Sequence, residues 1–236
     1  MRNILITISL LLSLKSVSQT FFDRVDNFLS KNVTFGLVDY GSISKSSAEL
    51  DSLVNMIETH EVSDSSANYR KAFYINAYNL LVIKQVVENY PVSSPKDIEG
   101  FFNETKFTVA GDQLTLDELE FDRLLVEDKD ARIHFAIACA ARSCPYLYEY
   151  SFRSESLEDQ LNSRAERIIQ RPNYVYVDID SKTVTLNMIF SWYADQFAPS
   201  DSELITYINQ FRPDSIPTNF KINHFEYDWS LNDRVE

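Results

Sequence analysis

The sequence predicts an α+β fold in which several helices pack around a small, mostly antiparallel sheet within a single domain. Two stretches, residues 47–60 and 66–90, carry apolar residues at helical spacing. Two others, residues 106–116 and 173–187, alternate apolar and polar residues on both sides of a turn, as β-hairpins do. Helices and hairpins without a repeated strand–helix–strand pattern are typical of α+β proteins. The chain has 236 residues, of which 44% are hydrophobic, and this is sufficient for one large core.

The first twenty residues, MRNILITISLLLSLKSVSQT, have the order of a secretory signal peptide. The basic Arg2 is followed by an apolar run over residues 4–14 and then by the small residues Ser16 and Ser18. The apolar run is short for a helix that crosses a membrane, so an uncleaved N-terminal anchor is the weaker alternative.

This N-terminal pattern sets the expected organisation of the chain. We expect residues 1–18 to be a signal peptide, residues 19–46 to be a lead-in and residues 47–236 to be the folded domain. The mature protein is then exported, either to the periplasm or out of the cell, and it has no integral membrane span. Since no cysteine follows the apolar run, no lipid attachment is expected at the cleavage point.

Composition excludes several classes of function. Four glycines, with no GxGxxG and no P-loop pattern, argue against a glycine-rich phosphate cradle. A net charge of -13 disfavours nucleic acid, whose phosphates need clustered lysine and arginine. The HExxH and GxSxG patterns are absent from the sequence, and so are histidines paired at metal-binding spacing. We therefore expect no metal, no cofactor and no nucleic-acid partner.

The two helical stretches differ in character. Residues 47–60 form an ordinary amphipathic pattern, whereas residues 66–90 carry Asn76 and Asn79 within their apolar face and stop before Pro91. A buried amide without hydrogen bonds costs about 1–3 kcal/mol. We expect the two asparagines to bond to the backbone of a neighbouring loop, with direct contact to a substrate as the alternative.

The central part of the chain combines a hairpin, a capped helix and an expected strand. The hairpin turns at Gly111–Asp112, and Thr115 is followed three residues later by Glu118, as in a capping box. Residues 131–138, ARIHFAIA, alternate as a buried strand does, although the alanines leave a helix as the alternative. In that strand one face carries Ile133, Phe135 and Ile137, and the other carries Arg132, His134 and Ala136.

The C-terminal third predicts three helices, one hairpin and a closing strand. The first helix starts at Ser154 or Ser156 and runs to residue 170, and the hairpin turns at Asp180–Ser181. The other helices cover residues 186–197 and 202–211, with Pro199 between them, and residues 220–233 close the chain as a strand or an extended tail.

Residues 133–147, IHFAIACAARSCPYL, hold both cysteines of the chain. One hypothesis makes Cys139 a catalytic nucleophile, which requires thiolate character and which Arg142 could favour. The base would be His134, His60 or His224. On a strand His134 faces away from Cys139, so the distant His224, oriented by Glu226 or Asp228, is the better candidate.

Two other interpretations of this segment stay open. It can be a packed structural turn, in which Cys139 and Cys144 form a disulfide in an oxidising compartment. Alternatively, Arg142, Ser143 and nearby backbone N–H groups can bind an anion or a peptide carboxylate.

Three blocks resemble the family catalogued as domain of unknown function 547. They are YRKAFYINAYNLLVIKQVVENYPV, then LTLDELEFDRLL with DARIHFAIACAARSCPYL, and the terminal YDWSLND, so the resemblance runs from Ser47 to Asp233. It implies an exported bacterial protein of a family without an established activity. Where the family commonly has Ile-Glu-His and then an arginine, this chain keeps Glu120 but has Phe121 and Leu125. The departure puts in doubt any role that needs that histidine or arginine.

Together these observations predict an exported binding module for an envelope or extracellular ligand, for example a peptide, with Asn76, Asn79, Arg142 and Ser143 as candidate binding residues. The alternative is a cysteine-dependent hydrolase or acyl transferase. Its candidate catalytic residues are Cys139, His134, His224 and Glu120.

Overall fold

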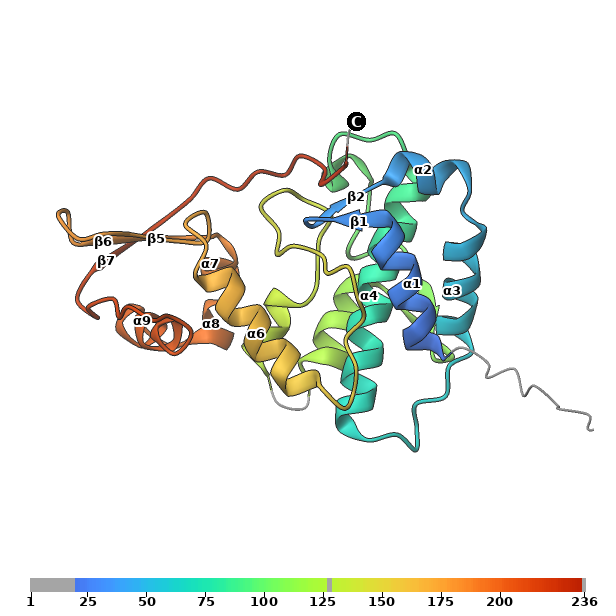
Figure 1. Cartoon of the computed structure of the whole chain (residues 1–236), viewed down its shortest axis with the longest axis horizontal. Helices are drawn as coiled ribbons and strands as arrows, with labels where there is room; N and C mark the ends of the chain where they lie inside the picture. Colours follow the sequence, from blue (N-terminus) through green and yellow to red (C-terminus); the bar gives the residue numbers. More distant parts are fainter. Residues whose placement is uncertain (1–19, 127–128, 235–236) are drawn as a thin grey trace, which may run out of the picture.

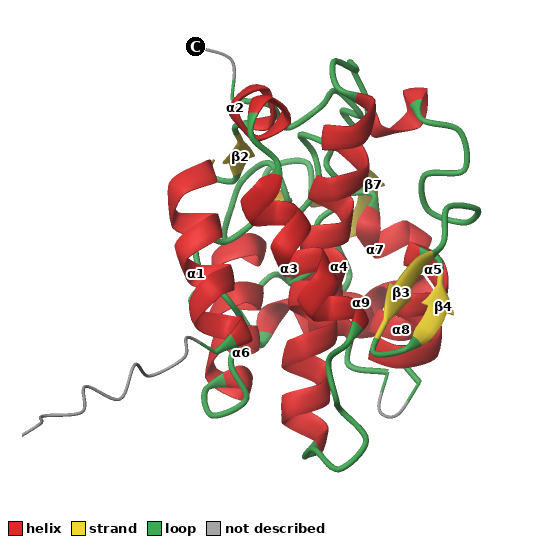
Figure 2. Ribbon diagram, turned by 90° about the vertical axis from the view of Figure 1, so that its right-hand side faces the viewer, coloured by secondary structure: helices red, strands yellow, loops and turns green. Residues whose placement is uncertain are grey.

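The computed structural model describes residues 20–126 and 129–234. The predicted signal peptide, residues 1–18, lies outside the described residues. The described part confirms the α+β fold class, because its many helices are accompanied by small sheets of two or three strands, most of them antiparallel. Figures 1 and 2 show the long helices packed side by side, with the short strands between and beside them.

The N-terminal half is mainly helical. It contains α1 (Phe21–Asn32), β1 (Val33–Thr34), β2 (Leu37–Val38), α2 (Tyr40–Lys45), α3 (Ala48–Glu58) and α4 (Ala67–Asn89). The first four of these elements form the segment expected as a lead-in, and their apolar side chains join the same core as those of α3 and α4.

Helix α4 is the centre of this half. It begins at Ser66, whose side chain accepts the N–H of Tyr69, and it ends before Pro91 as predicted. The helices α2, α3 and α5 (Leu116–Leu119) all contact it, so its side chains are buried from Ala72 to Ile83. A helix that is covered on all sides does not need a polar face, which explains why α4 is hydrophobic around most of its circumference.

The predicted central hairpin is confirmed as β3 (Phe107–Val109) paired with β4 (Asp112–Leu114). Its turn lies one residue earlier than expected, at Ala110 and Gly111, which have φ values of 50° and 87°. Because both turn residues have positive φ, the turn matches the right-handed twist of the strands.

A short helical segment follows this hairpin. Helix α5 (Leu116–Leu119) begins with the predicted capping box of Thr115 and Glu118 and continues as the π-helical turn η2 (Glu120–Leu124). The capping box is confirmed by two reciprocal hydrogen bonds of 2.8 and 3.1 Å.

The strand predicted for residues 131–138 is wrong. Residues 131–135 form the 3₁₀ helix η3 (Ala131–Phe135), which begins where the Asp130 side chain accepts the N–H of Arg132. The N–H groups of Ala136 and Ile137 both donate to the carbonyl of Ile133, at 2.8 and 3.1 Å. Alternation of apolar and polar residues indicates a strand only where one face is buried and the other is exposed. Here the segment is buried on nearly every side, so the alternation did not report its conformation.

The C-terminal half consists of α6 (Leu157–Ile169), β5 (Val175–Asp178), β6 (Thr183–Leu186), α7 (Ile189–Trp192), α8 (Ala194–Phe197), α9 (Asp201–Asn209) and β7 (Lys221–His224). The predicted hairpin is confirmed as β5–β6, and β7 adds to it in parallel orientation. The predicted helix over residues 186–197 is split, because Leu186 still belongs to β6 and the chain bends at Tyr193.

After β7 the chain returns to the N-terminal half. Residues 227–234, here called the strap, run along one side of the molecule from β7 toward α2 (Figure 1). Backbone hydrogen bonds join Asp228 and Ser230 of the strap to the 142–143 turn, and others join Asn232 to Ala140 and Val38.

The strap connects two hydrophobic clusters. One is formed mainly by α1–α5 and the 136–147 segment, and the other by α6–α9 with the three-stranded sheet. The side chain of Tyr227 packs against both. No helix in residues 20–126 or 129–234 is long and apolar enough to cross a membrane.

Candidate functional site

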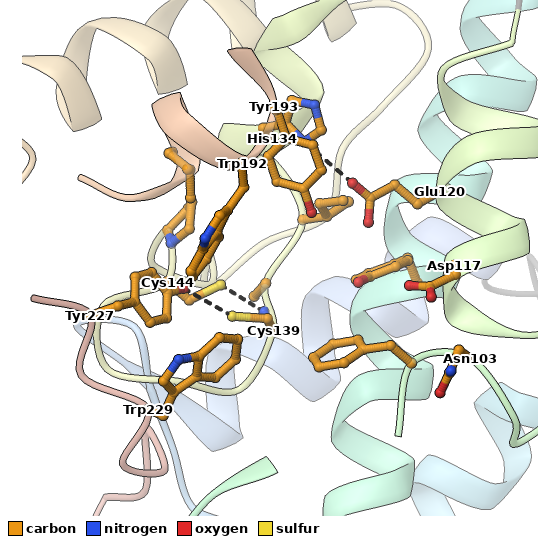
Figure 3. Close-up of a pocket in the computed structure, with 16 residues that line it drawn as sticks. Asn103, Asp117, Glu120, His134, Cys139, Cys144, Trp192, Tyr193, Tyr227 and Trp229 are labelled. Atoms are coloured by element: carbon orange, nitrogen blue, oxygen red, sulfur yellow. Dashed lines mark hydrogen bonds and ion pairs between the residues drawn. The ribbon is translucent and has the colours of Figure 1, made fainter. Parts of the chain in front are cut away.

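A cavity of about 440 Å³ opens between the two halves of the molecule. It is bounded by α5 and η2 on one side, by the 137–145 segment at its base, and by α7 and the strap on the other side. Figure 3 shows aromatic rings and sulfur atoms facing two carboxylates across this space. We call it the main pocket.

One wall of the main pocket is aromatic. Trp192, at the end of α7, lies 4.6 Å from Tyr227 and 5.6 Å from Trp229, measured between ring centroids. Tyr227 and Trp229 are 4.7 Å apart. Trp192 is 44% exposed, so its ring forms part of the rim, where a ligand can cover it.

The opposite wall carries two acidic side chains. Asp117 and Glu120 are three residues apart, so both face the pocket from one side of the helical segment (Figure 3). Glu120 is 3% exposed. Burial, together with the charge of Glu120, raises the pKa of the Asp117 carboxyl. The described residues that line the pocket include no lysine and no arginine.

His134 lies beside Glu120 and is fully engaged. Its Nδ1 is 3.3 Å from the Glu120 carboxylate, and its Nε2 is 2.7 Å from the side-chain oxygen of Gln196. Its ring stacks on Tyr193 with centroids 3.8 Å apart, and the residue is buried. These contacts connect η3 to η2 and α8, and among the described residues no hydrogen bond joins His134 to either cysteine.

The two cysteines form the base of the pocket. Cys139 is partly exposed and its Sγ lies 3.2 Å from the Tyr227 hydroxyl, while its backbone N–H donates to the Sγ of Cys144 at 2.7 Å. Both thiols are free. The left-handed backbone of Ala140, with φ of 61°, turns the chain between them.

These contacts shift the pKa values of the two thiols in opposite directions. Burial would raise the pKa of the Cys139 thiol, but hydrogen bonds from Cys144, from the Tyr227 hydroxyl and from the backbone lower it overall. Burial, and then the neighbouring Cys139, raise the pKa of Cys144 well above its usual value. Cys139 is therefore the more reactive of the two.

Several residues considered from sequence lie outside the main pocket. His224 is exposed at the end of β7, and Arg142 is exposed and donates to the carbonyl of Asp233 at 3.3 Å. Ser143 holds the strap, since its Oγ accepts the N–H of Asp228 at 2.9 Å. None of the three is among the described residues that line this pocket.

Asn76 and Asn79 bind the backbone of neighbouring segments. Asn76 exchanges two hydrogen bonds with Phe152, of 2.8 and 3.0 Å. Asn79 donates to the carbonyl of Ala136 at 3.0 Å and accepts the N–H of Ala138 at 2.9 Å. The second asparagine thereby fixes the chain directly before Cys139.

The sequence did not indicate Asp117, Tyr193 or the aromatic wall as parts of a site. The spacing of Asp117 and Glu120 was a usable signal, because residues three apart on a helix share a face. The aromatic wall left no local signal, since Trp192 and Trp229 meet only through the tertiary fold. Among the described residues there is no group of three or more histidine, cysteine, aspartate or glutamate side chains that could hold a metal ion.

Comparison with known proteins gives one result. No match to the chain was found among curated proteins or among solved structures. A family model with the description "Protein of unknown function, DUF547" matches residues 62–169. The matched segment is shorter than the predicted resemblance and does not include the strap. It contains α4, Asp117, Glu120 and both cysteines, so the part of the chain that supplies the acidic wall and the base of the main pocket is similar to the DUF547 family.

Proposed function

We propose that this protein is a binding module whose main pocket accepts a ligand with a cationic group, such as the amine or guanidinium of a basic peptide side chain. The observation that carries the proposal is the pairing of an aromatic wall with Asp117 and Glu120, in a pocket lined by no lysine or arginine among the described residues. Export to the envelope or the extracellular space belongs to this proposal and rests on the N-terminal sequence.

The energetics favour a cation at this place. A positive charge about 4 Å from a carboxylate near a protein surface gains roughly 4 kcal/mol of Coulomb energy before desolvation is subtracted. An aromatic face adds about 0.5–2 kcal/mol by cation–π attraction. A cation between Asp117 and Glu120 would also relieve the repulsion that contributes to the raised pKa of Asp117.

Calorimetry with two matched probes tests the proposal. N-acetyl-lysine amide carries a terminal amine, and N-acetyl-norleucine amide has the same four-carbon stem without it. We expect saturable heat only with the lysine derivative, and we expect Asp117→Asn to weaken its binding at least tenfold. Asp180→Asn, an exposed residue in the β5–β6 loop, removes the same charge as a control. Equal binding of both probes, or full affinity in Asp117→Asn, would show that no cation is recognised.

A second candidate function, cysteine-dependent acyl transfer, is favoured by Cys139. Its thiol is partly exposed at the base of the pocket, and its pKa is lowered overall despite burial. A thiolate of this kind can attack the carbonyl carbon of an ester or amide and form a thioester, while the bond to the alcohol or amine breaks and that group leaves with a proton from water. A second water then hydrolyses the thioester to the carboxylate and returns the thiol. Neither His134, whose nitrogens are engaged, nor the exposed His224 lies in a position to act as the base. The reaction would therefore depend on the fraction of Cys139 that is already ionised to the thiolate.

Thiol labelling tests this second candidate and also the predicted disulfide. Iodoacetamide should modify Cys139 in the reduced, folded protein, with a rate that levels off at lower pH than the rate for an unfolded cysteine. Cys139→Ser should abolish the reaction and Cys144→Ser should preserve it. Labelling that requires prior reduction would indicate a Cys139–Cys144 disulfide. An absence of labelling in reductant until the protein unfolds would rule out a free nucleophile.

A further inference from the structure

A second cavity, of about 220 Å³, lies beside α6 and is lined by Arg164, Arg167 and Arg171. These residues are spaced by three and four positions, so they follow one face of the helix and the turn after it. Tyr146 and Tyr148 complete the cavity wall. Arg167 and Arg171 are exposed at the cavity, whereas Arg164 is buried.

Arg164 is the most informative of these residues because it is only 4% exposed. Its Nε donates to the carbonyl of Phe135 at 2.6 Å, and within the described residues no carboxylate forms an ion pair with it. Burial lowers the pKa of its guanidinium. A buried charge without a counter-charge is unfavourable, so the free protein bears a penalty that a bound anion would reduce.

Three arginines elsewhere in the fold form ion pairs with carboxylates. Arg132 pairs with Asp130 and Glu158, Arg153 pairs with Asp23 and Asp26, and Arg234 pairs with Asp39. These three arginines are more exposed than Arg164, and the fold still supplies each with a carboxylate. The described part of the chain supplies none within ion-pair distance of Arg164, Arg167 or Arg171.

Two of the arginines stack on tyrosine rings, which orient their guanidinium groups. The guanidinium carbon of Arg164 lies 4.2 Å from the ring centroid of Tyr148, and that of Arg171 lies 3.8 Å from the ring centroid of Tyr146. Stacking occupies the flat faces of a guanidinium and leaves its N–H edges free for an oxyanion. The Tyr148 hydroxyl is also buried, with no hydrogen-bond partner among the described residues.

One carboxylate does line this cavity. Glu149 is exposed, and its Oε1 accepts the backbone N–H of Phe35 at 3.0 Å instead of pairing with an arginine. It therefore closes the rim of the cavity and leaves the guanidinium edges uncompensated.

We propose that Arg164, Arg167, Arg171, Tyr146 and Tyr148 form a binding site for a small molecule that carries a phosphate or carboxylate group. Planar guanidinium groups bind both kinds of oxyanion through paired N–H donors. The cavity is smaller than the roughly 300–1,000 Å³ of typical ligand pockets, so it fits one anionic group with a small body attached. The site is separate from the main pocket and does not depend on its function.

Calorimetry on the full chain, at constant ionic strength in chloride, tests this site. The probes are inorganic phosphate, benzoate and the neutral benzamide. Saturable binding of phosphate alone identifies a phosphate site, and binding of benzoate but not benzamide identifies a carboxylate site. Arg167→Gln combined with Arg171→Gln should weaken binding at least tenfold. Lys45→Gln combined with Lys182→Gln removes two exposed charges elsewhere and should leave the affinity unchanged.

Arg164→Met separates binding from a purely structural role. Replacing a buried, unpaired charge by an apolar side chain of similar length is often neutral or stabilising. We expect this variant to keep or raise the Tm of the free protein while losing the response to the anion. Failure of both phosphate and benzoate to bind saturably, or unchanged binding in the double arginine variant, would overturn the proposal.

Discussion

Asp117 faces the main pocket three residues before Glu120, and its carboxyl is held there with a raised pKa, through burial and the charge of Glu120. The sign of its effect on stability follows from proton linkage. The folded state holds this proton more tightly than the unfolded state, whose aspartate pKa is about 3.9. Asp117 therefore favours folding in acid, and that contribution is lost as the pH rises through its folded pKa.

The first prediction concerns the removal of this charge. We expect Asp117→Asn to raise the Tm at pH 7, because the amide ends the repulsion with Glu120 and is easier to bury. The difference from the native protein should shrink below about pH 4, where the unfolded aspartate also becomes protonated. Thermal melts across a pH series measure this effect, with Asp180→Asn as the exposed control. A lower Tm for Asp117→Asn at pH 7 would contradict the inference that the ionised Asp117 carboxylate destabilises the folded state.

Individual residues were predictable from sequence where their partners are near in the chain. Thr115 and Glu118 cap α5 across three residues, and Ser66 caps α4 in the same way. Asn79 was expected to bond to loop backbone, but its partners at Ala136 and Ala138 lie more than fifty residues away. The chemical nature of a buried amide predicts that it has partners, and only the tertiary fold determines which ones.

At the scale of elements, the helices α3, α4 and α6 and both hairpins were predictable because each has a repeating pattern and its own end signals. Helix α1 was missed, since its residues were expected only as a lead-in. The segment 131–138 was not predictable, because its eight residues are buried on most sides and period-two alternation then has no meaning. Asp130 selects the 3₁₀ helix through a side-chain bond to the N–H of Arg132. As a result His134 and Cys139, which a strand would separate, line one pocket.

The second prediction compares two turn glycines. Gly36 and Gly111 have φ of +83° and +87°, so alanine at either position adopts a strained left-handed backbone. That strain costs about 1–2 kcal/mol. At Gly111 an added Cβ meets nothing within 4 Å, whereas at Gly36 it would lie 2.6 Å from the Tyr146 ring.

We therefore expect Gly111→Ala to lower the free energy of unfolding by about 1–2 kcal/mol and to leave anion binding intact. Gly36→Ala should cost more and should also weaken the binding of whichever probe, phosphate or benzoate, the arginine cavity accepts, because Tyr146 supports Arg171. Urea unfolding and calorimetry measure the two effects. If both variants lose the same stability and bind the anion with the same affinity, the Tyr146 ring moves to make room for the added Cβ without displacing Arg171.

At the scale of the whole molecule, the strap joins the two hydrophobic clusters. Asn232 is buried in it, with Oδ1 accepting the Tyr40 hydroxyl at 2.9 Å and Nδ2 donating to the carbonyl of Gly36 at 3.2 Å. These contacts connect residues nearly two hundred positions apart in the sequence. No local pattern could have predicted them, and for residues 220–233 the sequence indicated only a strand or an extended tail.

The third prediction tests this connection. Asn232→Ala leaves two buried polar groups without partners, and each should cost about 1–3 kcal/mol of unfolding free energy. Asn223→Ala, an exposed position on β7, should change it by less than about 0.5 kcal/mol. Urea unfolding followed by circular dichroism gives both values. A loss in Asn232→Ala no larger than in the control would show that the strap contributes little to stability.

The aromatic wall has a consequence for how this protein can be studied. Trp192 and Trp229 are the two tryptophans of the chain, and their rings lie 5.6 Å apart at the mouth of the main pocket. The tryptophan fluorescence of the native protein, excited at a wavelength that tyrosine does not absorb, therefore originates at one place, beside the space where a ligand would sit. A compound that enters the main pocket should alter that emission, and one that binds only beside α6 should not. The protein thus contains its own optical probe, which allows unlabelled compound libraries to be screened before any ligand is known.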